Sequence, residues 1–226
     1  MINYIKKVFA LLSKDLRIEF RTKDSFNSMF VFALLMIIVF NYAFDLTRKE
    51  TLEIASGILW IAFTFSGILG LNRSFSYEKE NSAIEGIILS PVDRSAIYLG
   101  KFLSNFLIML LFEVVLLPFF VIFFNLKILS DLPILFLVML LGTWGFVSVG
   151  TIFSAISVQT KMREIMLPLL LFPIAVPVII GAVESTSYII QEENWQLIWL
   201  WIQRLIGINV IYFTISFILF EYVIVE

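Results

Sequence analysis

Six long apolar stretches dominate the sequence and restrict what the chain can fold into. Each is long enough for a transmembrane helix, because about 20 apolar residues cross roughly 30 Å of hydrocarbon. Sixty per cent of the 226 residues are hydrophobic, more than a soluble domain of this size can bury. We therefore expect an all-α membrane protein with a single domain, residues 1–226. The predicted spans are residues 26–44, 54–71, 102–126, 132–158, 165–183 and 205–225.

The distribution of basic residues predicts how these helices are oriented. With the amino terminus in the cytoplasm, twelve lysine and arginine residues fall on the cytoplasmic side and four on the outer side. Cytoplasmic loops are enriched in lysine and arginine, so both termini are expected to be cytoplasmic.

The composition excludes several kinds of chemistry. The chain has no histidine and no cysteine, which rules out disulfides, thiol nucleophiles, Ser–His pairs and histidine-bound zinc. We therefore predict no catalytic residue, no metal site and no covalently bound cofactor. The net charge of −2 argues against nucleic acid as a partner.

The sequence also lacks a phosphate-binding loop for nucleotides. The nearest string, residues 100–102, has neither the earlier glycine nor the hydroxyl residue that this motif requires. If ATP drives this protein, the ATPase must be a separate polypeptide.

Residues 1–22 are predicted to form a helix in the membrane interface. Apolar residues recur there at three- and four-residue steps, while basic residues fall largely on another face. An apolar stripe beside a basic face suits the inner headgroup layer. The stripe contains Ile5, Val8, Phe9, Leu12, Leu16 and Phe20.

The longest cytoplasmic segment, residues 73–101, is predicted to contain a short helix. Ser82 and Glu85 fit a capping box at its start, and Pro91 disfavours helix beyond about Ser90. This helix would present an apolar face, which either packs on the chain's own helices or docks on a cytoplasmic partner. We favour docking. The face consists of Ile84, Ile87 and Ile88.

The outer segment 184–204 is predicted to hold an amphipathic helix on the outer face, before the sixth span. Its apolar residues fall at i, i+3, i+4 and i+7, and tryptophan is favoured at membrane interfaces. These residues are Trp195, Ile198, Trp199 and Ile202.

Glu113 is predicted to lie in the middle of the third span. A carboxylate there is costly and marks a candidate functional site. It could pair with a cation, carry a proton, or hydrogen-bond backbone groups freed by Pro118. Alternatively, it is a protonated glutamic acid satisfied at a helix–helix contact.

Three prolines, Pro168, Pro173 and Pro177, interrupt the fifth span. Each removes a backbone donor, so a broken or kinked helix is predicted. Such helices often line transport routes, although they can also merely shape packing.

Small residues in the fourth span predict close helix contacts. Gly150 and Ser154 form a small-xxx-small pair, which we assign to packing within the chain rather than to a dimer seam. The predicted packing residues are Gly142, Gly145, Gly150 and Ser154.

Several short motifs run along nearly the whole chain in a characteristic order. They lie at 14–21, 57–60, 73–75 with Glu78, 89–91, 100–101, 142–143 with 145–146, and 167–173 with Pro177. In length, order and spacing the chain resembles the CcmB family of ABC-transporter permeases, which form the membrane part of the haem exporter in bacterial cytochrome c maturation.

The resemblance implies an ABC-2-like permease in a bacterial inner membrane, with two copies of the chain bound to two copies of a cytoplasmic ATPase. The loop between the second and third spans would be the coupling helix that sits on the ATPase. Further implied partners are a haem-handling membrane protein, a periplasmic haem chaperone and membrane lipids. The residues implied in coupling are Glu78, Ser82, Ile84, Glu85, Ile87, Ile88 and Pro91.

The cargo stays open at this point. Haem could pass through this chain, or ATP hydrolysis could drive release of the loaded chaperone, which fits a chain without histidine or cysteine better. Two other functions are an ABC-2-type permease for a lipid-linked glycan or drug, and an ion-coupled carrier that uses Glu113 without an ATPase.

Overall fold

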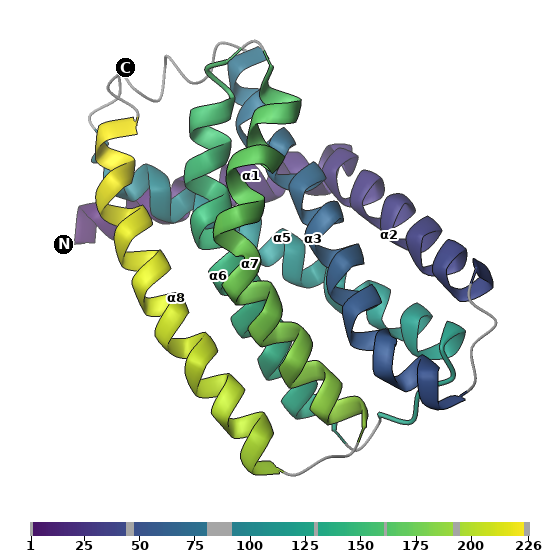
Figure 1. The fold of residues 1–226 in the computed structure, drawn as a ribbon. Helices are drawn as coiled ribbons and strands as arrows, with labels where there is room; N and C mark the ends of the chain where they lie inside the picture. Colours follow the sequence, from purple (N-terminus) through teal and green to yellow (C-terminus); the bar gives the residue numbers. More distant parts are fainter. Residues whose placement is uncertain are drawn as a thin grey trace.

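The chain is a bundle of long helices in the computed structural model shown in Figure 1. The structure describes residues 2–43, 48–80, 92–128, 131–160, 162–191 and 195–223. These ranges contain helices and no strand, so the predicted all-α fold is confirmed. The helices are α1 (Ile2–Thr22), α2 (Asp24–Ala43), α3 (Arg48–Glu80), α5 (Arg94–Phe123), α6 (Leu132–Ser157), α7 (Arg163–Ile190) and α8 (Trp195–Val223).

Six of these helices are long and apolar enough to cross a membrane, which confirms the predicted number. They occupy Asp24–Ala43, Lys49–Ser76, Arg94–Phe123, Leu132–Ser157, Glu164–Ile190 and Trp195–Val223. The second, third and sixth begin several residues before the predicted apolar stretches. Helical hydrogen bonding continues outside the predicted apolar stretches because it does not depend on side-chain polarity.

The third span ends earlier than the predicted residue 126. Helix α5 stops at Phe123, and Asn125 has a backbone φ of 49°. Asparagine tolerates this left-handed conformation better than most residues, so it allows the chain to turn there.

The amphipathic helix predicted before the sixth span is not a separate element. The first part of that segment ends α7, Trp195 begins α8, and residues 192–194 lie outside the described residues. The buried positions Ile198, Ile202 and Leu205 follow one another at helical spacing. No proline or glycine separates them, so the helix continues directly into the span.

Helix α1 crosses the bundle instead of running along it (Figure 1). It packs mainly on α5, and Val8 and Leu12 of the predicted stripe are buried. Ile5, Phe9 and Phe20 are exposed. One side of α1 thus contacts protein while other apolar side chains can face lipid, an arrangement that suits an interfacial helix.

Helix α6 contacts α3, α5, α7 and α8, and its small residues allow these close approaches. A Cβ atom on Gly142 would lie 2.2 Å from Cη2 of Trp60 on α3, and one on Gly150 would lie 2.4 Å from Cδ1 of Leu71. Ser154 donates a hydrogen bond of 2.6 Å to the carbonyl of Leu71. These predicted packing positions therefore join helices of the same chain.

Gly145 makes a similar contact with α8. A Cβ atom there would lie 2.2 Å from Oδ1 of Asn209. The Asn209 amide donates a hydrogen bond of 2.8 Å to the carbonyl of Leu141. The glycine therefore gives a polar side chain of α8 room to reach the backbone of α6.

Candidate functional site

A buried lysine joins three helices near one end of the bundle. The Nζ atom of Lys101 on α5 lies 3.0 Å from Oδ2 of Asp15 on α1 and 2.9 Å from Oε1 of Glu78 on α3. It also donates a hydrogen bond of 3.1 Å to the carbonyl of Ser74. The lysine is only 2% exposed, so its charge depends on these partners rather than on water.

Close packing of α1 on α5 makes this contact possible. A Cβ atom on Gly100 would lie 2.7 Å from Cβ of Leu11, so any larger side chain at position 100 would push α1 away. The next residue, Lys101, therefore reaches Asp15 directly.

Two further groups complete what we call the Lys101 network: Lys14, Asp15, Glu78, Lys101 and Ser104. Lys14 pairs with Glu78 and lies 3.2 Å from Asp15, and Ser104 donates a hydrogen bond of 3.1 Å to Asp15. Burial opposes the charge of Lys14, but Asp15 and Glu78 outweigh this effect and hold the pKa of Lys14 above its usual value. The network is thus balanced, with two cations and two carboxylates.

The network lies beside the segment predicted to couple to an ATPase. Glu78 lies in the last turn of α3, and the neighbouring Lys79 donates a hydrogen bond to the carbonyl of Val158 at the end of α6. Residues 81–91 follow directly and lie outside the described residues. The predicted coupling residues in that segment are Ser82, Ile84, Glu85, Ile87, Ile88 and Pro91.

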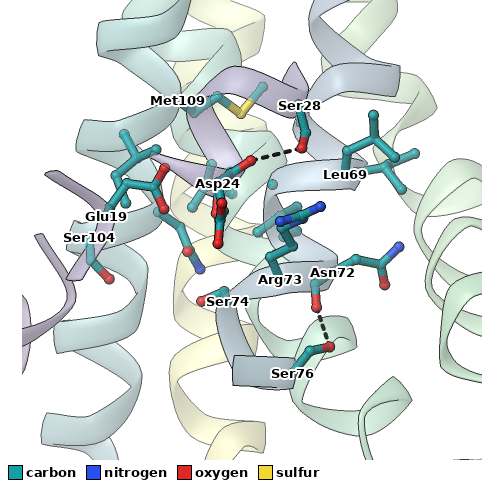
Figure 2. A pocket seen from close by; sticks show the side chains of 18 of the residues that line it. Glu19, Asp24, Ser28, Leu69, Asn72, Arg73, Ser74, Ser76, Ser104 and Met109 are labelled. Atoms are coloured by element: carbon teal, nitrogen blue, oxygen red, sulfur yellow. Dashed lines mark hydrogen bonds between the residues drawn. The ribbon is translucent and has the colours of Figure 1, made fainter. Parts of the chain in front are cut away.

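A pocket of about 940 Å³ opens next to the network, with Asp15, Glu78, Lys101 and Ser104 in its wall. Helices α1, α2, α3 and α5, Val147 of α6 and the first part of α7 line it. Figure 2 shows polar side chains from several helices around the pocket, together with the apolar side chains of Leu69 and Met109. The polar lining labelled there consists of Glu19, Asp24, Ser28, Asn72, Arg73, Ser74, Ser76 and Ser104.

Glu113 does not line this pocket and lies in a fully buried contact between α5 and α6. Both of its carboxyl oxygens are 2.7 Å from Oγ1 of Thr143, which donates the hydrogen bond. Its partner among the described residues is thus a hydroxyl on another helix rather than backbone near Pro118. Within the described ranges, no group of three or more aspartate or glutamate side chains is placed so that it could hold a metal ion.

The proline-containing span is one uninterrupted helix. Pro168, Pro173 and Pro177 all lie within α7, which runs from Arg163 to Ile190. Of the two predicted outcomes, a broken or a kinked helix, the break does not occur. Neighbouring helices can compensate for prolines inside a membrane helix. Pro177 leaves the carbonyl of Pro173 without its helical donor. The neighbouring carbonyl, that of Ile174, accepts a hydrogen bond of 2.7 Å from the Tyr212 hydroxyl on α8. Pro118 likewise lies inside the continuous α5.

Comparison with known protein families identifies the family of this chain. The family model described as CcmB protein matches residues 6–221, which include the Lys101 network and the whole pocket lining. The chain belongs to the CcmB family. This confirms the resemblance found from the sequence motifs.

Several relatives match the chain at modest identity over lengths from under half to most of it, and each of the three described here is named Heme exporter protein B. The protein of Rhodobacter capsulatus is 30% identical over 175 residues, which cover 77% of this chain and 80% of the relative. The protein of Pseudomonas aeruginosa is 28% identical over 200 residues, which cover 87% and 89%. The Escherichia coli K12 protein is 26% identical over 102 residues, 45% of each chain.

Sequence reasoning finds parts of the Lys101 network but does not connect them. Glu78 is predicted to act in coupling and Lys101 belongs to a CcmB-like motif, while Asp15 and Lys14 belong to another motif. The predicted span begins at residue 102, which puts Lys101 at the membrane surface. A helix that begins at Arg94 instead buries Lys101, and a buried lysine requires carboxylate partners.

Proposed function

We propose that this CcmB-family chain is the membrane permease of an ATP-driven ABC transporter complex for haem export or delivery in bacterial cytochrome c maturation. The family match over residues 6–221 carries the proposal. The name of its relatives, Heme exporter protein B, supplies the cargo class. Six apolar helices support a place in the bacterial inner membrane, and the basic-residue bias supports cytoplasmic termini.

A separate ATPase is part of this proposal because the sequence has no phosphate-binding loop. Two ATPase copies would bind two copies of the chain, and ATP would be bound only by the ATPase. Haem would be cargo rather than a resident cofactor. A haem-handling membrane protein and a periplasmic haem chaperone would complete the pathway, with haem either carried by this chain or released with the loaded chaperone.

The Lys101 network would connect the ATPase-facing segment to the rest of the chain. Glu78 stands just before residues 81–91, and Lys101 ties it to Asp15 on α1. Breaking a buried ion pair by removing one partner costs roughly 3–5 kcal/mol. The end of α3 and the interfacial helix α1 are therefore expected to move together when the ATPase pushes on the coupling segment.

Co-purification tests the proposal. The tagged full-length chain is extracted from its native membrane in mild detergent, and the polypeptides that travel with it are identified by mass spectrometry. We expect an ABC ATPase and a haem-handling membrane protein in the eluate. An eluate with neither, from membranes that contain both, contradicts the proposal.

The docking surface is tested by the triple variant Ile84→Asp, Ile87→Asp and Ile88→Asp. This variant is expected to lose the ATPase while the chain itself is still produced and inserted. Lys127→Asp, an exposed charge reversal after the far end of α5, serves as the control and should retain the ATPase. Retention of the ATPase by the triple variant would show that the segment does not dock.

A further inference from the structure

The pocket beside the Lys101 network has the layout of an amphiphile-binding site. Its volume of about 940 Å³ lies within the range of about 300–1,000 Å³ that is typical of small-molecule sites. It lies where the interfacial helix α1 ends and the spanning helix α2 begins, since Thr22 and Asp24 both line it. A site at this corner is open to molecules of the membrane interface.

Three helices line the pocket with the same pattern, a charged residue at the rim and a phenylalanine eight residues deeper along the helix. Eight residues of helix correspond to about 12 Å. The rings of Phe65 and Phe172 are in contact, with centroids 5.1 Å apart. The pairs are Asp24 and Phe32 on α2, Arg73 and Phe65 on α3, and Glu164 and Phe172 on α7.

Helix α5 contributes the part of the pocket wall between the charged rim and the deeper phenylalanines. Ser104 and Asn105 line it on the rim side, and Ile108 and Met109 line it one turn deeper. The lining therefore changes from polar to apolar along α5 as it does along α2, α3 and α7. This gradient matches a ligand with a polar head and an apolar tail.

The rim has charges of both signs that are available to a ligand. Asp15 and Glu78 are neutralised by Lys14 and Lys101. Arg73, Asp24 and Glu164 form no ion pair with any side chain that the structure describes. Figure 2 shows Arg73 and Asp24 among the side chains that line the same pocket.

The balance of these rim charges selects among possible head groups. With Glu19 included, three carboxylates face one guanidinium outside the network, an excess of two negative charges. This excess disfavours a ligand with two carboxylates, such as haem, and also an anionic phospholipid. A zwitterion fits better, since its phosphate can bind Arg73 and its ammonium can bind the carboxylates.

The rim also distinguishes between the two common zwitterionic head groups. Quaternary ammonium groups are typically bound by aromatic cages, but here the phenylalanines lie deeper than the charges. The rim offers carboxylates and the hydroxyls of Thr22, Ser25 and Ser28, which accept hydrogen bonds from a primary ammonium. We propose that this pocket binds phosphatidylethanolamine, with its phosphate at Arg73, its ammonium among Asp24, Glu19 and Glu164, and its acyl chains along the phenylalanines.

Native mass spectrometry of the full-length chain tests this proposal without any ATPase, so its result is independent of the proposed function. The chain is delipidated in detergent and given equimolar dioleoyl phosphatidylethanolamine, phosphatidylcholine and phosphatidylglycerol. We expect one phosphatidylethanolamine to be retained about tenfold more than either other lipid, the effect of losing one charge-assisted contact. Equal or stronger retention of phosphatidylglycerol, or no retained lipid, overturns the proposal.

Variants with conservative changes at the exposed rim provide a second readout. Arg73→Gln should lower phosphatidylethanolamine retention about tenfold. The double variant Asp24→Asn and Glu164→Gln removes the negative excess and should shift the preference toward phosphatidylglycerol. The control Glu53→Gln, at the other end of α3, should bind as the unchanged chain does. Unchanged phosphatidylethanolamine retention in Arg73→Gln, or an unchanged lipid preference in the double variant, overturns the proposal, as does Arg73-dependent binding of haem that displaces phosphatidylethanolamine.

Discussion

Trp60 on α3 occupies the space that a side chain at Gly142 on α6 would need, with its Cη2 atom 2.2 Å from the position of that missing Cβ. The indole is held there because its N–H group donates a hydrogen bond of 2.9 Å to Thr186 on α7. Three helices therefore meet around one ring, and the smallest side chain on α6 is required for their packing.

Gly142→Ala should destabilise the fold, because Trp60 cannot move away without losing its hydrogen bond to Thr186. Overpacking of this kind typically costs about 1–3 kcal/mol. Thermal unfolding in detergent, followed by tryptophan fluorescence, measures the change. Gly57→Ala is the matched control, because a Cβ atom there meets nothing within 4 Å. Equal melting temperatures for the two variants would mean that this contact is not tight.

Lys101→Met should loosen α1 strongly, because Asp15 and Glu78 would then face each other with one cation fewer. Removing one partner of a buried ion pair costs roughly 3–5 kcal/mol. Limited proteolysis of α1 and the melting temperature report the effect. Lys49→Met is the control, since Lys49 is exposed and its contact with Glu53 at 3.9 Å is weak.

Neutralising the whole contact should restore much of the lost stability. The triple variant Lys101→Met, Asp15→Asn and Glu78→Gln leaves no uncompensated buried carboxylate beside position 101, and neutral replacements of buried ion networks are often tolerated. A triple variant as unstable as Lys101→Met would show that Lys101 acts through packing rather than through charge.

Glu113→Gln should retain the contact between α5 and α6, because the amide oxygen can still accept the hydrogen bond from Thr143. Glu113→Leu should cost about 1–3 kcal/mol, since the buried Thr143 hydroxyl loses its acceptor. Comparison of the melting temperatures of the two variants checks this. If Glu113→Gln abolishes haem delivery with no loss of stability, Glu113 has a transport role beyond this contact.

The ion pairs of Lys14 predict a loss of stability at high pH. The folded pKa of Lys14 is raised above its ordinary value of 10.5. Its contribution is therefore fully present below pH 10.5 and is lost as the pH rises through the higher folded pKa. Protease protection of α1, measured across this range, should fall less steeply in Lys14→Met than in the unchanged chain. Identical pH profiles for the two chains would show that the ion pairs of Lys14 do not hold α1 in place.

Local patterns were sufficient to predict the spans, but not which polar groups pair across them. Apolar length gives the six spans, and three- and four-residue periodicity gives α1, because both depend on neighbouring residues. Trp195, Ile198 and Ile202 show where this approach fails, since a short amphipathic pattern looks the same whether its helix ends or continues into a span.

Partners distant in the sequence were not predictable from one chain. Glu113 stands out as an unusual residue, but its contact with Thr143 joins positions 30 residues apart. Lys101 and Asp15 are separated still further, and their pairing depends on how α1 crosses α5. The pocket likewise depends on six helices meeting, although its repeated spacing of a charge and a phenylalanine is visible in the sequence once the helices are known.

The most direct test of the central claim is ATP hydrolysis by the purified full-length chain, alone and with the ATPase that co-purifies with it. We expect no hydrolysis by the chain alone. We expect the complex with the ATPase to hydrolyse ATP. When the tagged chain carries Ile84→Asp, Ile87→Asp and Ile88→Asp, we expect the eluate to have lost this ATPase activity. Hydrolysis by the chain alone, or a triple variant that brings down full ATPase activity, would contradict it.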